Sequence, residues 1–271
     1  MKIASLLRKY SIEPKRSLGQ NFLTNESVAR RIAELSELTS RDTVVEIGTG
    51  LGILTVELSR VAGRVITYET DRRLMPVHWE ILSEQRNVEI IYGDFMKTPL
   101  PLDADEAASY VSNIPYHLTS PIIERIAFGE HDFERAVLMV QKEFADRLTA
   151  KPSTKSYGSL TVVLSALCEI SELLSLSRHS FFPAPGVDSV VTKLTPRDNQ
   201  IIQKDERDKF RSLVKTSFSE RRKTLKNNLK SIMGDVDYLL DRAGIMKSAR
   251  AEELGVEEFV KLFRVVQEES L

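Results

Sequence analysis

The first 195 residues alternate between short apolar runs and longer amphipathic segments. Segments with helical spacing, such as Ile53–Val61 and Leu74–Glu84, lie between most of the first five runs. Repetition of strand and helix with almost continuously apolar strands predicts a doubly wound α/β domain, a mostly parallel sheet with helices on both faces. The five strands expected first are Thr43–Ile47, Val65–Glu69, Val88–Tyr92, Ala107–Ser112 and Ala136–Gln141.

The pattern changes toward the C-terminus. Two further runs, Ile170–Leu176 and Ser189–Thr195, lack an intervening helix, so we expect them to pair antiparallel at one edge of the sheet. Residues 196–200 read as a linker, and helical spacing alone follows. We expect two domains, a Rossmann-like catalytic domain over 1–196 and a small all-helical domain over 201–271. The apolar positions of the expected helices are Phe210, Leu213, Val214, Phe218, Leu225, Leu229 and Ile232, with further helices at about 236–243 and 255–267.

Composition is that of an ordinary globular protein. Of 271 residues, 42% are hydrophobic and 28% charged, and no apolar run approaches the roughly 18 residues of a membrane span. The five-residue apolar stretch Ile3–Leu7 is too short for the core of a signal peptide, so we expect a cytoplasmic protein that does not bind membranes. With Cys168 as the single cysteine and four scattered histidines, we expect no metal site.

Charge is balanced overall but not locally. The chain has 38 Lys and Arg against 39 Asp and Glu, a net charge of −1 that by itself speaks against a nucleic-acid partner. Residues 1–30, however, carry six basic and two acidic side chains, and residues 215–230 carry six basic side chains against Glu220. Either segment is a solvated helix face or a local RNA contact. The candidates for RNA contact are Arg221, Arg222, Lys223 and Lys226.

A glycine-rich loop follows the first strand. Its sequence from Glu46 to Gly52 has G-x-G-x-G spacing, with Ile53 where a dinucleotide-binding motif has its third glycine. Glu69 ends the second strand, where a carboxylate meets ribose hydroxyls, and Asp94 ends the third, within reach of an adenine amino group. A ligand with ribose and adenine that needs no phosphate clamp fits S-adenosylmethionine better than NAD.

The fourth strand ends in Asn113-Ile114-Pro115-Tyr116, at the same edge of the sheet. An exocyclic adenine nitrogen is a poor nucleophile because its lone pair is delocalised into the ring. The Asn113 side-chain oxygen and the Ile114 carbonyl can hold its two hydrogens, and Pro115 directs that carbonyl. Tyr116 offers a face for stacking the base. Phe181, in a proline-rich stretch, is either a second stacking ring or a core residue.

These residues together resemble the KsgA/Dim family of small-subunit rRNA adenine dimethyltransferases. The resemblance runs from about Pro14 to at least Leu229. It is carried by the glycine loop, the Asn113–Tyr116 motif and three further stretches, Ser17–Leu23, Phe181–Ser189 and Ser217–Leu225.

The resemblance implies an S-adenosylmethionine-dependent enzyme that dimethylates N6 of two adjacent adenines in the 3′-terminal hairpin loop of small-subunit rRNA. We expect it to act as a monomer on the assembling small ribosomal subunit. The resemblance also places a set of residues at the donor site, namely Gln20, Asn21, Leu23, Gly48, Glu69, Asp94 and Asn113.

Four positions depart from the family pattern. Ile114 stands where leucine is frequent, which is harmless because only its carbonyl is needed, and Thr49 replaces a frequent proline. Gly186 stands where lysine is common, which removes one possible phosphate contact. His117 follows the tyrosine where an amide is frequent, and its role stays open.

Three alternatives remain. A large-subunit rRNA adenine methyltransferase shares the glycine loop and the Asn113–Tyr116 motif, but the Ser219–Leu225 segment favours the small-subunit family. A DNA adenine methyltransferase lacks support because the chain has no additional sequence-reading region. A non-catalytic RNA-binding assembly or transcription factor on the same fold is disfavoured by the intact Glu69, Asp94 and Asn113.

Overall fold

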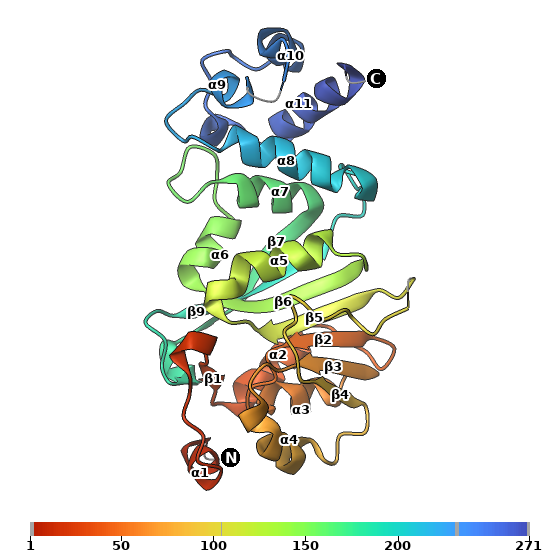
Figure 1. Cartoon of the computed structure of the whole chain (residues 1–271), viewed down its shortest axis with the longest axis vertical. Coiled ribbons are helices and arrows are strands. Elements are labelled where there is room, and N and C mark those ends of the chain that lie inside the picture. The colour runs from red at the N-terminus through yellow and green to blue at the C-terminus, as the bar shows by residue number, and fades with distance from the viewer. Residues whose placement is uncertain (1–2, 104, 231–232, 270–271) are drawn as a thin grey trace. The chain divides into compact units, whose positions relative to one another are not determined.

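A computed structural model of the chain describes residues 3–103, 105–230 and 233–269. It divides into two compact units. The first unit comprises Met1–Lys142 and Ser171–Thr195, and the second comprises Glu143–Ile170 and Pro196–Leu271 (Figure 1).

A mostly parallel sheet of seven strands is the centre of the first unit. Its strand order is β4-β3-β2-β5-β6-β9-β7. The strands from β4 to β6 in this order run parallel to one another, and β9 runs antiparallel to β6. This confirms the expected fold class and the adjacent positions of the last two strands at one edge. The strands are β2 (Thr43–Ile47), β3 (Arg64–Tyr68), β4 (Val88–Ile91), β5 (Ala108–Asn113), β6 (Phe133–Gln141), β7 (Cys168–Leu176) and β9 (Ser189–Pro196).

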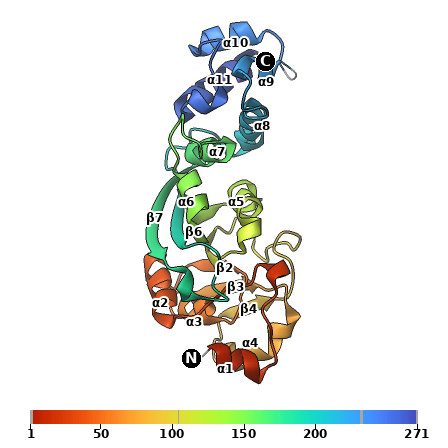
Figure 2. The same cartoon turned by 90° about the vertical axis from the view of Figure 1, so that its left-hand side faces the viewer.

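The central strands are apolar because both faces of the sheet are covered. Val44 and Val45 of β2 pair with Val65 and Ile66 of β3, and all four side chains are fully buried. Parallel register also brings the carboxyl ends of β2, β3, β4 and β5 to one edge, where ligands bind in open α/β folds. Figure 2 shows α2 (Glu26–Leu35) and α3 (Ile53–Ser59) on one side of the sheet and α5 (Thr119–Phe128) on the other.

The N-terminal segment is tied to a distant part of the same unit. After α1 (Ile3–Lys9) and the short helix η1 (Arg16–Leu18), strand β1 (Phe22–Leu23) pairs antiparallel with β8 (Phe181–Phe182). This two-stranded sheet is too short to be expected from periodicity. The other elements of the first unit are η2 (Arg72–Leu74), α4 (Met75–Leu82), η3 (Tyr116–Leu118) and η4 (Arg178–Ser180).

The second unit is helical. Edge-to-face packing of Phe210 on Phe263, with ring centroids 5.4 Å apart, and stacking of Phe218 on Phe259 at 5.7 Å build its core. It is larger than the expected 201–271, because α7 packs on α8 and α11. Ile232, an expected helix position, lies outside the described residues. The helices are α6 (Lys142–Leu148), α7 (Ser159–Leu167), η5 (Lys204–Glu206), α8 (Arg207–Ser217), α9 (Leu225–Leu229), α10 (Val236–Ala243), η6 (Ala251–Glu253) and α11 (Val256–Glu269).

Candidate functional site

The glycine loop lies between β2 and α3 at the carboxyl edge of the sheet. Its first residues are held by the end of β3, since the Gly48 and Thr49 amides both donate to the Tyr68 carbonyl, at 2.8 and 3.1 Å. Gly48 has a φ of +87°, and the nearest atom to a Cβ placed there would be the Asn113 carbonyl oxygen, 3.9 Å away. The loop therefore presents bare backbone to an open space in front of Asn113, a surface that admits a close-fitting ligand.

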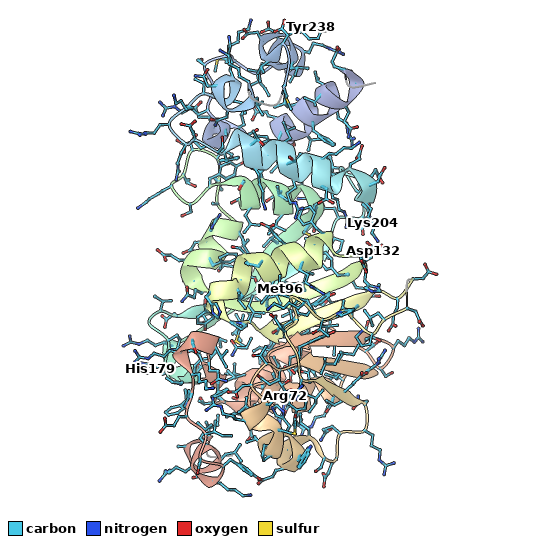
Figure 3. The ribbon with its side chains drawn as sticks, in the orientation of Figure 1. Arg72, Met96, Asp132, His179, Lys204 and Tyr238 are labelled. Carbon is cyan, nitrogen blue, oxygen red and sulfur yellow. The ribbon has the colours of Figure 1, made fainter. Side chains whose placement is uncertain are left out.

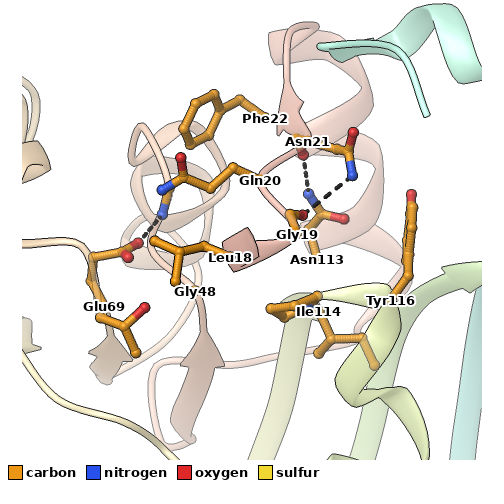
Figure 4. A pocket seen from close by; sticks show the side chains of 13 residues that line it. Leu18, Gly19, Gln20, Asn21, Phe22, Gly48, Glu69, Asn113, Ile114 and Tyr116 are labelled. Carbon is orange, nitrogen blue, oxygen red and sulfur yellow. Dashed lines mark hydrogen bonds between the residues drawn. The ribbon is translucent and has the colours of Figure 1, made fainter. Parts of the chain in front are cut away.

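Glu69, directly after β3, faces this space and is only 6% exposed. Figure 4 labels Glu69 at the edge of the pocket. Its Oε2 accepts a hydrogen bond of 2.9 Å from the Gly50 amide, and its Oε1 accepts one of 2.8 Å from the Asp71 amide. Burial raises the pKa of Glu69, and the two amides oppose that shift. Because each carboxylate oxygen has a further lone pair, the group is oriented and still able to accept bonds from ribose hydroxyls.

Asn113 is the last residue of β5, and its amide group has a defined orientation. Nδ2 donates to the Asn21 main-chain carbonyl at 2.9 Å (Figure 4). The opposite atom, Oδ1, is thereby left as the acceptor on the other side of the amide. Ile114, Pro115 and Tyr116 continue the wall of the same pocket.

The Tyr116 ring is anchored at its hydroxyl. The hydroxyl lies 2.7 Å from Oγ of Ser189, the first residue of β9, and Ser189 is fully buried. Burial raises the pKa of Tyr116, so the phenol stays neutral and its ring is available for stacking at neutral pH. No sequence pattern pointed to Ser189 as a partner of Tyr116, because the two residues are 73 positions apart.

The segment from Leu18 to Phe22 forms the opposite wall of the pocket. Gln20 secures it, since Nε2 donates to Asp71 Oδ2 at 2.8 Å and Oε1 accepts the Lys15 amide at 2.7 Å. Asp71 also accepts from the Arg73 guanidinium at 2.6 Å, and this contact is the main reason that the pKa of Asp71 falls to about 2. Asp71, which is 4% exposed and supports the pocket wall through Gln20, is missed by the sequence analysis because nothing in the local sequence distinguishes it from other acidic residues.

Most of the expected site residues come together in this pocket, and three do not. The pocket is lined by Gln20, Asn21, Gly48, Glu69 and Asn113 to Tyr116, together with Leu18, Gly19, Phe22, Gly50 and Thr70. Leu23 and Phe181 are cross-strand partners whose side chains are buried in the core cluster. Asp94 lies outside the lining; its Oδ1 accepts the amide of Met96 in the turn after β4 (Figure 3).

Two residues beside the pocket point away from it. Phe181 is 3% exposed and packs in the core, whereas its neighbour Phe182 is 43% exposed, because residues alternate between the two faces of β8. Glu46, a strand-end acid, points into the protein rather than the pocket. Its Oε2 accepts bonds from the hydroxyls of Thr55 and Thr67, and burial raises its pKa to about 8.

His117 packs against the N-terminal wall of the pocket. A Cβ built on Gly19 would lie 2.9 Å from His117 Nδ1, so only glycine fits at position 19 in this arrangement. The absence of a side chain at Gly19 therefore lets His117 support the segment that carries Gln20 and Asn21. Among the described residues no group of three or more His, Cys, Asp or Glu side chains is arranged to hold a metal ion.

The basic segment of the second unit splits into two kinds of residue. Arg221 forms an ion pair of 2.5 Å with Glu252 and donates to the carbonyls of Thr154 and Lys155. Lys226 forms an ion pair of 2.5 Å with Asp237. Arg222 and Lys223 are exposed. Two of the four expected RNA contacts therefore have structural partners, which sequence could not show because the acids lie 31 and 11 residues away.

A Rossmann-like sheet with a glycine loop, a strand-end glutamate and an Asn-Ile-Pro-Tyr wall defines a methyltransferase that uses S-adenosylmethionine. The model of the family "Ribosomal RNA adenine dimethylase" matches residues 12–268. The chain belongs to this family. It is therefore an S-adenosylmethionine-dependent enzyme that methylates adenine in ribosomal RNA.

Individual relatives agree with that assignment. The chain is 42% identical to the ribosomal RNA small subunit methyltransferase A of Thermotoga maritima, over 97% of this chain and 89% of that protein. The structure resembles a dimethyladenosine transferase from Plasmodium falciparum, with a TM-score of 0.79, 30% identity and coverage of 92% of this chain and 98% of that one. It also resembles the 23S rRNA methyltransferase ErmE, with a TM-score of 0.70, 31% identity and coverage of 91% and 100%.

In the part of the chain that the structure describes, no helix has the length and apolar character needed to cross a membrane.

Proposed function

We propose that the substrate is small-subunit rRNA, and that the enzyme dimethylates N6 of two adjacent adenines in its 3′-terminal hairpin loop. The relative from Thermotoga maritima is named for the small subunit, and the Ser219–Leu225 segment of this chain matches the small-subunit family. We further propose that the protein acts in the cytoplasm, as a monomer, on the assembling small subunit.

The observation that carries the mechanism is the orientation of Asn113. Its Nδ2 is occupied by the Asn21 carbonyl, so Oδ1 and the Ile114 carbonyl are the acceptors for the two amino hydrogens of adenine. In the first transfer, gripping both hydrogens favours a tetrahedral nitrogen whose lone pair is free to attack. In the second transfer a single hydrogen remains to be held, and after each transfer the nitrogen loses one proton to solvent. Tyr116, held by Ser189, provides the stacking surface. Catalysis then consists mainly of positioning.

The residues around the glycine loop fit the methyl donor. S-adenosylmethionine supplies an activated methyl group on a sulfonium, so no strong base is needed. Glu69 is oriented to accept ribose hydroxyls, and Gln20 and Asn21 hold the opposite wall. We propose that Gly48 contacts the donor through its bare backbone, and that Asp94 accepts from the adenine amino group. Leu23 and Phe181 support the wall from the core beneath it.

Labelled S-adenosylmethionine and small subunits that lack the methylation test this proposal. We expect label in two adjacent adenines of the small-subunit RNA, and no label in large subunits or DNA. The similarity to ErmE makes large-subunit RNA the most informative competitor. Label that appears in large-subunit RNA instead would reject the proposed substrate while leaving the family assignment intact.

A further inference from the structure

A buried histidine lies directly against the glycine loop. His78, in the middle of α4, is 1% exposed. Its Nε2 is 2.8 Å from the Gly50 carbonyl oxygen, and its Nδ1 is 2.8 Å from the Tyr92 hydroxyl. The same helix meets the loop again at Gly52, where a Cβ would contact Ile81 and Leu82 at 3.4 Å. Helix α4 therefore supports the loop at two points one turn apart.

The partners of His78 define its tautomer. A carbonyl oxygen only accepts, so the bond to Gly50 requires a proton on Nε2. In the neutral ring Nδ1 is then an acceptor, and the Tyr92 hydroxyl is its donor. Burial lowers the pKa of His78 and raises the pKa of Tyr92, so both groups are neutral at pH 7.

This pair of bonds connects to the wall of the donor pocket. The Gly50 carbonyl is held by His78, and the Gly50 amide donates to Glu69 Oε2 at 2.9 Å. Side chains therefore hold both main-chain polar groups of Gly50, its carbonyl by His78 and its amide by Glu69. Gly50 itself has a φ of +55°. Tyr92, at the other side of His78, follows β4 and precedes Asp94 by two residues. The imidazole therefore links the glycine loop after β2 to the residue after β4, and the Gly50 amide extends this link to Glu69 at the end of β3.

We propose that His78 is a positioning residue of the donor site, whose Nε2 proton holds the Gly50 carbonyl and thereby keeps the glycine loop and Glu69 in the geometry that binds S-adenosylmethionine. The inference rests on the proposed role of the loop and Glu69 in donor binding. His78 lies behind the loop and acts through Gly50. Its loss therefore weakens the affinity for the donor and leaves the methyl-transfer step at saturating donor unchanged.

Two substitutions separate the hydrogen bond from packing. The amide nitrogen of glutamine reaches the place of Nε2, whereas that of asparagine reaches only the place of Nδ1. Loss of a neutral hydrogen bond changes an affinity by up to about tenfold. We expect His78→Asn to raise the Kd for S-adenosylhomocysteine, measured by calorimetry, by about tenfold, and His78→Gln to raise it by less than about threefold. The KM for the donor follows the Kd, and kcat stays within twofold of the parent value.

Matched controls make the outcome specific. Val77→Ala, at the fully buried neighbouring position in α4, removes packing but no hydrogen bond, and should lower the melting temperature without changing the Kd. Equal losses of affinity in His78→Asn and His78→Gln, or none in His78→Asn, would overturn the proposal. Glu69→Ala tests the proposed donor site separately. If this variant binds S-adenosylhomocysteine as tightly as the parent protein, the proposed role of Glu69 in donor binding is wrong, and the role of His78 that depends on it is wrong as well.

A measurement on the unaltered protein covers the case in which a variant does not fold. Nitrogen-15 spectra of the labelled imidazoles, assigned by replacing His117, His131 and His179 one at a time, report the tautomer of His78. We expect the form protonated on Nε2, with that proton slow to exchange because the ring is buried. A ring protonated on Nδ1 would contradict the proposal, since the Gly50 carbonyl would then have no donor.

Discussion

The side-chain amide of Asn113 donates a hydrogen bond of 2.9 Å to the main-chain carbonyl of Asn21, across 92 residues of sequence. The bond joins the end of a central strand to the N-terminal wall of the pocket. It gives the amide a single useful orientation, with Oδ1 free to accept. In the proposed mechanism the N-terminal segment therefore orients Asn113 toward adenine as well as forming one wall of the pocket.

Asn113→Ala removes the acceptor for one amino hydrogen of adenine. We expect kcat to fall by about 100-fold or more, because catalysis here depends on orientation, while the Kd for S-adenosylhomocysteine stays within about threefold. Asn113→Asp is the matched variant, since it keeps the shape but sets a carboxylate oxygen against the Asn21 carbonyl. Asn113→Asp should make residues 18–24 more mobile, and hydrogen exchange of their main-chain amides should be faster than in the parent protein. Normal turnover in Asn113→Ala would remove Asn113 from the mechanism, and unchanged amide exchange at residues 18–24 in Asn113→Asp would show that the bond to Asn21 does not hold this segment.

The Tyr116–Ser189 pair predicts a coupled loss of stability. Ser189→Ala leaves a half-buried tyrosine hydroxyl without its partner, and we expect it to lower the free energy of unfolding by about 1–2 kcal/mol. Tyr116→Phe should cost a similar amount, and the double variant less than the two added together. Urea unfolding measures all three. Additive losses would show that the 2.7 Å contact contributes nothing.

Two substitutions of Tyr116 distinguish, in activity assays, the role of its hydroxyl from the role of its ring. Tyr116→Phe keeps the ring, so the KM for the RNA substrate should change by less than about threefold. Tyr116→Ala removes a stacking surface worth about 1–3 kcal/mol, so kcat/KM should fall by about 5-fold to 150-fold. Equal activity of the two variants would mean that the ring does not stack on the base.

The ion pairs of Arg221 and Lys226 predict that the residues of the basic segment have different roles. Reversing the charge of exposed Arg222 and Lys223 should weaken binding to small subunits by about tenfold and flatten its salt dependence, since each phosphate contact releases counterions. Arg221→Ala should instead lower the melting temperature by about 2–4 °C, because it frees Glu252 and the Thr154 and Lys155 carbonyls. Unchanged subunit binding in the Arg222 and Lys223 variant would make the segment a solvated face.

Glu46 predicts a dependence of stability on pH. Its pKa in the folded protein is about 8, above the value near 4.5 expected in the unfolded chain, because burial disfavours the charged form. The folded state thus binds this proton more tightly. The stability that the neutral carboxyl contributes is full below about pH 4.5 and is lost as pH rises toward 8.

Glu46→Gln provides the test, because glutamine offers a neutral oxygen to Thr55 and Thr67 at every pH. Between pH 5 and 8.5 the parent protein should lose a few kcal/mol of unfolding free energy relative to the variant. Parallel stability curves for the two proteins would show that Glu46 is already ionised at pH 5.

Sequence predicts those parts of the fold and site that depend on local patterns. The strand Thr43–Ile47 has the expected bounds, since a strand buried on both faces is apolar throughout. The Asn113–Tyr116 wall was found because it follows directly on a strand. By contrast, only the family resemblance indicated Gln20 and Asn21, because their partners, Asp71 and Asn113, are distant in sequence.

The residues that the sequence analysis misassigned or missed have partners that are distant in sequence. Phe181 and Phe182 are chemically identical and adjacent, so only the pairing of β8 with β1 decides which ring is buried. Arg221 and Lys226 appear free in a local count of charge, and their partners Glu252 and Asp237 are supplied by tertiary packing. Ser189 belongs to a recognised stretch, but its bond to Tyr116 exists only in three dimensions.

The pairing of β1 with β8 has a consequence for synthesis of the protein. Phe22 finds its partner only at Phe182, and the Thr24 amide donates to the carbonyl of Ser180. At translation rates of about 5–20 residues per second, these partners appear about 8–30 s after the N-terminal segment. A nascent chain shorter than about 180 residues therefore has the glycine loop but lacks the strand that pairs with the N-terminal wall of the pocket.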